Sequence, residues 1–189
     1  MELAASARAR YPHIMSLNIG PAENADAGDG GVGAPPPPNE ANRVFARLTK
    51  EYASDTIRVQ WYARRCIHSA ACIRALPDVF DPSRRPWIKP ELASADAIAN
   101  AVLQCPTGAL QFVRLDGGPG EVPPDTVQIR AIKDGPYFIR GPVEVQDENG
   151  NVIRNDTRFA LCRCGQSKHL PFCDNTHRAI GFRSGPSEP

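Results

Sequence analysis

The 189-residue sequence has no long apolar run, no strong excess of charge and few aromatic residues. No stretch approaches the roughly 20 apolar residues that a membrane-spanning helix needs, so we expect no membrane span. Basic residues number 22 and acidic residues 21, which gives no electrostatic reason to expect a nucleic-acid partner or a membrane surface. Aromatic residues make up 7%, so each hydrophobic core is modest, and a small core often needs a metal centre for stability.

The sequence also shows no pattern typical of a secretory signal, although it contains six cysteines. Disulfides form in oxidising compartments, and nothing in the sequence indicates one. Six cysteines therefore favour metal ligation in a reducing cytoplasm. We find no nucleophile–base pair, phosphate-binding loop or dinucleotide fingerprint. We therefore expect a cytoplasmic protein that is not an enzyme by itself.

Glycine and proline are numerous, with 15 and 19 residues, but they are clustered. Residues 1–42 contain few large apolar side chains and are predicted to be a disordered tail. The Gly/Pro-rich stretch 116–125 is predicted to be a linker between two domains, 43–115 and 126–183. Residues 184–189 are predicted to form a second disordered tail.

Apolar periodicity and turn residues predict the secondary structure of both domains. A helix is predicted over 94–104, with Ser94 or Asp96 as its N-cap. Asn149–Gly150 is a strong signal for a tight hairpin turn. The predicted strands are 57–62, 110–115, 126–132, 137–140, 143–145 and 158–162.

The densest chemical signal is the spacing C-x-C-x8-C-x3-H of Cys162, Cys164, Cys173 and His177. Thiolates select zinc, copper(I) or iron–sulfur clusters, and imidazole is compatible with zinc or iron. A single intervening residue is too short for the C-x2–4-C hook of a structural zinc site. The spacing favours an iron–sulfur cluster and leaves a structural zinc site as the alternative.

The residues between these ligands resemble the CDGSH iron–sulfur (mitoNEET-like) family, whose pattern is C-x-C-x2-S/T-x3-P-x-C-D-G-S/A/T-H. Ser167, Pro171, Asp174 and Thr176 also match that pattern. Asn175 departs from it by replacing glycine, but asparagine tolerates a left-handed backbone better than most residues.

The CDGSH resemblance implies a [2Fe–2S] cluster held by three cysteines and one histidine. It implies that Cys162 and Cys164 bind one iron, and that Cys173 and His177 bind the other. Ser167 and Asp174 are expected around the ligands, and Asp174 is also predicted to cap a short helix that runs through His177.

A second cysteine set is formed by Cys66, Cys72 and Cys105. The run CIHSAAC compares with the bacterial ferredoxin run C-x2-C-x2-C-x3-C-P, with Ser69 in place of its second cysteine. Leu76–Pro77 stands where the fourth Cys–Pro pair would be, and Cys105–Pro106 supplies the remote Cys–Pro. These matches leave the cysteine ligands of a single cluster, and that cluster has three of them.

About residues 44–115 resemble the divergent single-cluster ferredoxin domain. The predicted fold class is therefore α+β, with a ferredoxin-like N-terminal domain followed by a small, mostly β CDGSH-type domain. Three cysteines suit a [3Fe–4S] cluster, whereas a [4Fe–4S] cluster would need Ser69, His68 or solvent at the fourth iron. For His68 we favour hydrogen bonding or packing. Buried free thiols are the alternative for the cysteines, and the retained Cys–Pro argues against it.

The leading functional prediction is a two-cluster electron carrier that exchanges electrons with a redox partner protein, either a reductase or an acceptor. The alternative is a protein for cluster storage, transfer to an apo-acceptor or redox sensing, with a labile His-ligated [2Fe–2S] cluster. A purely structural zinc module is the third reading. The CDGSH resemblance leaves a homodimer open.

Overall fold

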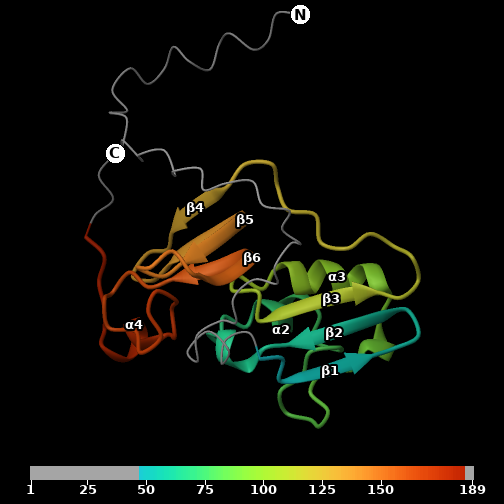
Figure 1. The fold of residues 1–189 in the computed structure, drawn as a ribbon. Helices are drawn as coiled ribbons and strands as arrows, with labels where there is room; N and C mark the ends of the chain where they lie inside the picture. Colours follow the sequence, from blue (N-terminus) through green and yellow to red (C-terminus); the bar gives the residue numbers. More distant parts are fainter. Residues whose placement is uncertain (1–46, 186–189) are drawn as a thin grey trace, which may run out of the picture. The chain divides into compact units, whose positions relative to one another are not determined.

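The computed structural model describes residues 47–185. The predicted tail 1–42 and residues 186–189 lie outside the described residues. The described residues form two three-stranded antiparallel sheets, ordered β1-β2-β3 and β4-β5-β6 (Figure 1). We call residues 47–115 the first half and residues 126–185 the second half. The predicted α+β fold class is confirmed.

The first sheet consists of β1 (Lys50–Ala53), β2 (Ile57–Trp61) and β3 (Leu110–Arg114). Ile57 and Val59 on β2 are fully buried, and the residues between and after them are partly exposed, so the predicted alternation is confirmed.

Helix α3 (Ala95–Leu103) packs against this sheet and buries Ile98 and Val102 (Figure 1). The Ser94 hydroxyl accepts a hydrogen bond from the Ala97 amide, which confirms Ser94 rather than Asp96 as the N-cap. The end of α3 leads directly to Cys105.

The segment between β2 and α3 carries the other two cysteines of the first half. It contains the short helix α2 (Ala71–Ala75) and two 3-10 turns, η1 (Ala63–Arg65) and η2 (Pro90–Leu92). Cys66 follows η1 directly, and Cys72 lies in α2. The sequence prediction missed β1 and α2, because both are short and three of the four β1 residues are exposed.

The second sheet consists of β4 (Gln128–Ala131), β5 (Tyr137–Gln146) and β6 (Val152–Leu161). The prediction of two strands at 137–140 and 143–145 is wrong, because β5 continues through Gly141–Pro142 with a register shift. A bulge accommodates the proline, which has no amide hydrogen to donate. Gly141 has φ +137°, and a Cβ there would lie 2.9 Å from the Val127 backbone, so the bulge requires glycine.

Strand β6 is longer than predicted: it begins at Val152 rather than at residue 158. The predicted turn before it is confirmed, because the Asp147 carboxylate accepts hydrogen bonds from the Asn149 and Asn151 amides.

After β6 the chain forms the ligand loop and the short helix α4 (Thr176–Ala179). The predicted C-terminal tail starts too early, since the Ser184 amide donates to the Asp134 carboxylate at 2.8 Å. None of the helices in the described part of the chain is long and apolar enough to cross a membrane.

Candidate metal centres

The four predicted ligands of the second half come together as two close pairs. The Cys162 and Cys164 sulfurs are 3.7 Å apart, and the Cys173 sulfur lies 3.5 Å from Nδ1 of His177. Metal–thiolate bonds are about 2.3 Å and metal–imidazole bonds about 2.0 Å, so two ligands of one tetrahedral metal are separated by roughly 3.5 to 3.8 Å. Each pair therefore has the spacing of two ligands on one metal.

The four side chains do not converge on a single point. Within residues 47–185, no group of three or more His, Cys, Asp or Glu side chains is arranged to hold one metal ion. A structural zinc site would gather all four ligands around one ion. The two pairs fit one metal each, and this spacing argues against the zinc alternative.

The backbone after β6 places the two pairs side by side. The Cys162 amide donates to the Pro171 carbonyl, and the Cys173 amide donates to the Ala160 carbonyl, each at 2.8 Å. The loop thus returns along the end of β6 and brings Cys173 back beside the strand. Ser167 closes the loop by donating its hydroxyl to the Phe172 carbonyl at 2.7 Å.

Asp174 holds the segment that leads to His177. Its carboxylate accepts hydrogen bonds from the Lys168 and Thr176 amides, both at 2.9 Å. Burial would raise the pKa of Asp174, but hydrogen bonds from the Thr176 side chain and from the Thr176 and Lys168 amides outweigh burial and hold the pKa at about 2. The N-cap of α4 is Asn175 rather than the predicted Asp174, although Asp174 does bind the first helical amide. Asn175 has φ +77°, the left-handed backbone for which the CDGSH pattern uses glycine.

The environments of the four ligands differ. His177 and Cys173 are 8% and 9% exposed, whereas Cys162 and Cys164 are half-buried. Burial, with the neighbouring Arg178 charge, lowers the pKa of His177 and so favours the neutral imidazole that binds metal. Burial also raises the pKa of Cys173.

The three cysteines of the first half also come together. Cys66, Cys72 and Cys105 line a common cavity of about 30 Å³, and Ser69 lines it with them. Burial raises the pKa of Cys66 and, with the charge of Cys105, raises that of Cys72 to about 11. The positive charge of a bound metal favours the thiolate, so a cluster would overcome this burial penalty.

Ser69 and His68 are in different places, although they are adjacent in the sequence. His68 is exposed, and it lines a groove of about 520 Å³ that opens beside Cys66 and Cys72. His68 and Ala70 have positive φ angles of 52° and 58°, so the chain between the two cysteines is sharply folded. Ser69, rather than His68, therefore faces the cavity that the three cysteines line.

Comparison with known proteins matches both halves to iron–sulfur families. Residues 52–115 match the family described as a divergent 4Fe-4S mono-cluster domain, and residues 134–178 match the CDGSH-type iron-binding zinc finger. The chain belongs to these two iron–sulfur families. The predicted order, with the divergent ferredoxin domain first and the CDGSH domain second, is confirmed. The first half is thus the mono-cluster half, and the second half is the CDGSH half.

The chain is also similar to an uncharacterized protein, YjdI, of Escherichia coli. The two are 31% identical over 61 residues, which are 32% of this chain and 80% of YjdI from strain K12. YjdI from Escherichia coli O157:H7 matches to the same extent.

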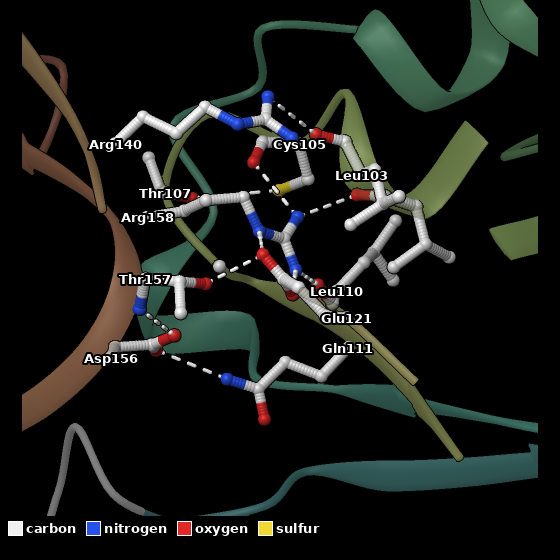
Figure 2. Close-up of polar contacts among 12 residues, drawn as sticks. Leu103, Cys105, Thr107, Leu110, Gln111, Glu121, Arg140, Asp156, Thr157 and Arg158 are labelled. Carbon is white, nitrogen blue, oxygen red and sulfur yellow. Dashed lines mark hydrogen bonds and ion pairs between the residues drawn. The ribbon is translucent and has the colours of Figure 1, made fainter. Parts of the chain in front are cut away.

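The sequence analysis missed a set of buried charged residues where the two halves meet. The Arg158 side chain of the CDGSH half is surrounded by the backbone of the mono-cluster half and by the Glu121 carboxylate (Figure 2). Glu121 belongs to the predicted linker 116–125, so this stretch also provides a buried ion-pair partner. Charged residues on a strand normally indicate a solvent-exposed face, and the sequence contained no signal to the contrary.

Proposed function

We propose that the protein is an electron carrier with two iron–sulfur clusters, one in each half. The observation that carries this proposal is the packing of Ile67, which follows the ligand Cys66 directly. Ile67 is 6% exposed and packs in one hydrophobic cluster with Ala160 and Cys173. A residue adjacent to a mono-cluster ligand therefore packs with a CDGSH ligand. Two redox centres this close in the fold suit electron transfer within one chain.

In the CDGSH half we propose a [2Fe–2S] cluster on Cys162, Cys164, Cys173 and His177. The paired ligand spacing and the absence of a single-ion site among the described residues support this assignment. In the mono-cluster half we propose a [4Fe–4S] or [3Fe–4S] cluster on Cys66, Cys72 and Cys105. The position of Ser69 in the same cavity supports Ser69 as the fourth ligand of a [4Fe–4S] cluster. The clusters supply one-electron chemistry, and the chain supplies ligands, burial and hydrogen bonds.

We propose an acidic redox partner protein, with electron exchange at the groove beside Cys66 and Cys72. Apolar side chains, including Trp61 and Trp87, line most of this groove. Lys50 and Arg85 also line it, and no carboxylate is among its lining residues in the described part of the chain. Replacing Lys50 and Arg85 by glutamate should slow reduction by an anionic quinol sulfonate more than reduction by the cationic methyl viologen radical. If the reduction rates with the two reductants fall by the same factor, the groove has no electrostatic role.

Anaerobic purification followed by iron and sulfide analysis and EPR tests the two-cluster proposal. We expect about five or six irons per chain, from a two-iron centre and a three- or four-iron centre. Chemical reduction and reoxidation should leave both centres intact. Two irons per chain, with Cys66, Cys72 and Cys105 reactive as free thiols, would contradict the proposal for the mono-cluster half.

Cluster transfer is the second candidate function, and the partial exposure of the first ligand pair, Cys162 and Cys164, favours it. Cys162 and Cys164 are half-buried, and the next residues, Gly165 and Gln166, are exposed. A cluster bound there would be accessible to an acceptor. Incubation of the loaded protein with an apo-ferredoxin separates the two functions. Rapid appearance of the ferredoxin spectrum with loss of iron from this chain favours transfer, whereas retention of both clusters through redox cycles favours electron transport.

A further inference from the structure

We propose that Arg154 and Arg158 of the CDGSH half position Cys105, the third ligand of the mono-cluster half, and tune the centre that it binds. This inference rests on the proposed function, because it requires a cluster on the three cysteines of the mono-cluster half. It adds that residues of the CDGSH half hold a ligand of the mono-cluster centre in place.

The Arg158 guanidinium binds three points of one short segment. Arg158 is 1% exposed. It donates hydrogen bonds to the carbonyls of Val102 at 2.6 Å, Cys105 at 3.0 Å and Leu110 at 2.9 Å (Figure 2). Val102 lies in the last turn of α3 and Leu110 begins β3. Arg158 therefore fixes both ends of the segment that carries Cys105, and the ligand residue between them.

Arg154 holds the same segment from a second direction. Its guanidinium donates to the Thr107 carbonyl at 2.6 Å and to the Asp156 carboxylate at 2.7 Å. The Thr107 hydroxyl in turn lies 3.7 Å from the Cys105 sulfur. Arg154 thus acts on the residue whose side chain contacts the proposed ligand atom.

Gly108 shows how closely the two halves fit at this point. It has φ +62°, and a Cβ on it would lie 2.8 Å from the Arg154 guanidinium and 3.0 Å from the Asp156 carboxylate. Any larger residue would have to displace the arginine or the loop. The left-handed backbone and the close approach of the CDGSH half therefore both favour glycine in the sequence CPTG.

A second ligand of the mono-cluster half is held in the same way. Arg65, directly before Cys66, forms an ion pair with Asp156 at 3.1 Å, and the two side chains are 9% and 6% exposed. Ile67, directly after Cys66, packs against Ala160. Asp156 therefore links the side chain of the residue before Cys66 to Arg154, and through Arg154 to the Cys105 loop.

The charge of this buried set explains the effect on the centre. Arg65, Arg154 and Arg158 carry three positive charges, and Asp156 and Glu121 carry two negative charges. The set thus has one excess positive charge beside the proposed thiolate ligands. Positive charge near an iron–sulfur cluster favours its reduced, more negative state and raises its reduction potential. We therefore expect the arginines to raise the potential of the mono-cluster centre.

The test uses the full chain, with both centres loaded. The double variant Arg158→Met with Glu121→Gln removes the guanidinium without leaving its carboxylate partner charged and buried. Substituting a residue that holds a metal ligand in place costs roughly 10- to 100-fold in metal affinity, so we expect at least a roughly tenfold loss of affinity at the mono-cluster centre. Iron and sulfide counts and EPR report each centre separately, and the CDGSH centre is the internal control. Arg140→Met is the matched control variant, since Arg140 is exposed and, among the described residues, its side chain donates a single hydrogen bond of 3.3 Å, to the Leu103 carbonyl next to this segment.

A second variant, Arg154→Gln, measures the electrostatic effect and covers the case in which the double variant fails to fold. It keeps a hydrogen-bond donor but removes one positive charge. We expect a lower reduction potential for the mono-cluster centre, with the CDGSH potential changed less. Normal occupancy in the double variant together with an unchanged mono-cluster potential in Arg154→Gln would overturn the inference. Absence of the mono-cluster centre from the wild-type protein would instead contradict the proposed function.

Discussion

The two halves of the protein are stabilised in different ways. The mono-cluster half has a continuous hydrophobic core in which β2, α3 and the segment around Phe80 bury apolar side chains completely. The CDGSH half has a much smaller core around Ile139, Phe159 and Phe172. The CDGSH half instead buries arginine side chains that bind the backbone of its neighbour. Small cores rarely suffice alone, so the CDGSH half should depend more on its metal and on its neighbour.

Metal removal should have the largest effect and should separate the halves most clearly. We expect the apoprotein to lose most of the amide protection of β4–β6 while β1–β3 and α3 stay protected. Metal-binding free energy contributes directly to folding in small metal domains, and the CDGSH half has little core to replace it. Hydrogen exchange of loaded and chelated protein, followed by mass spectrometry, measures this. Equal loss of protection in both halves would show that they unfold as one unit.

Truncation of one buried phenylalanine in each half is the next test. Phe159 and Phe80 are both 0% exposed, which makes Phe159→Ala and Phe80→Ala a matched pair. Each substitution should cost about 3–5 kcal/mol of unfolding free energy. We expect Phe159→Ala to release the CDGSH cluster as well, because its ring also stacks on Phe172 next to Cys173. Visible absorbance and denaturant titration measure both effects. Retention of the CDGSH cluster in Phe159→Ala would show that its ligand loop does not depend on this core.

Ser69→Cys should change the mono-cluster centre and leave the CDGSH centre unaltered. If the wild-type centre is [3Fe–4S], the new thiolate should hold a fourth iron and convert the centre to [4Fe–4S], because Ser69 lines the same cavity as the three cysteines. EPR of the oxidised protein measures this, since the [3Fe–4S] signal should disappear. His68→Cys is the control, because His68 lines the open groove. Conversion by His68→Cys but not by Ser69→Cys would reverse the assignment.

The sequence predicted the local features of both halves well. The strand at Ile57, the cap at Ser94 and the turn at Asn149–Gly150 each depend on residues close together in the chain, so their patterns could be recognised. The paired ligands of the CDGSH half were implied by a compact motif, and the structure gives them that spacing.

The arginines at the junction could not be predicted in the same way. Arg154 and Arg158 lie among Asn155, Asp156 and Thr157, a polar run typical of a solvent-exposed strand. They are buried only because the mono-cluster half supplies carbonyl acceptors from residues about 50 positions earlier in the chain, as the sequence separations of 47 to 56 show. Such acceptors depend on tertiary structure and leave no periodic pattern.

The smallest expected effect concerns Asn175, and it should be confined to the CDGSH half. Asn175 has φ +77° between the ligands Cys173 and His177. Alanine is strained in this conformation, so Asn175→Ala should lower the stability of the CDGSH half by about 1 kcal/mol. Asn175→Gly restores the residue of the CDGSH pattern and should be neutral or slightly stabilising, because glycine adopts this backbone without strain. Thermal loss of the CDGSH absorbance measures both variants, with the mono-cluster EPR signal as the control. If alanine is tolerated as well as glycine, the left-handed backbone at residue 175 does not contribute to holding the ligand pair.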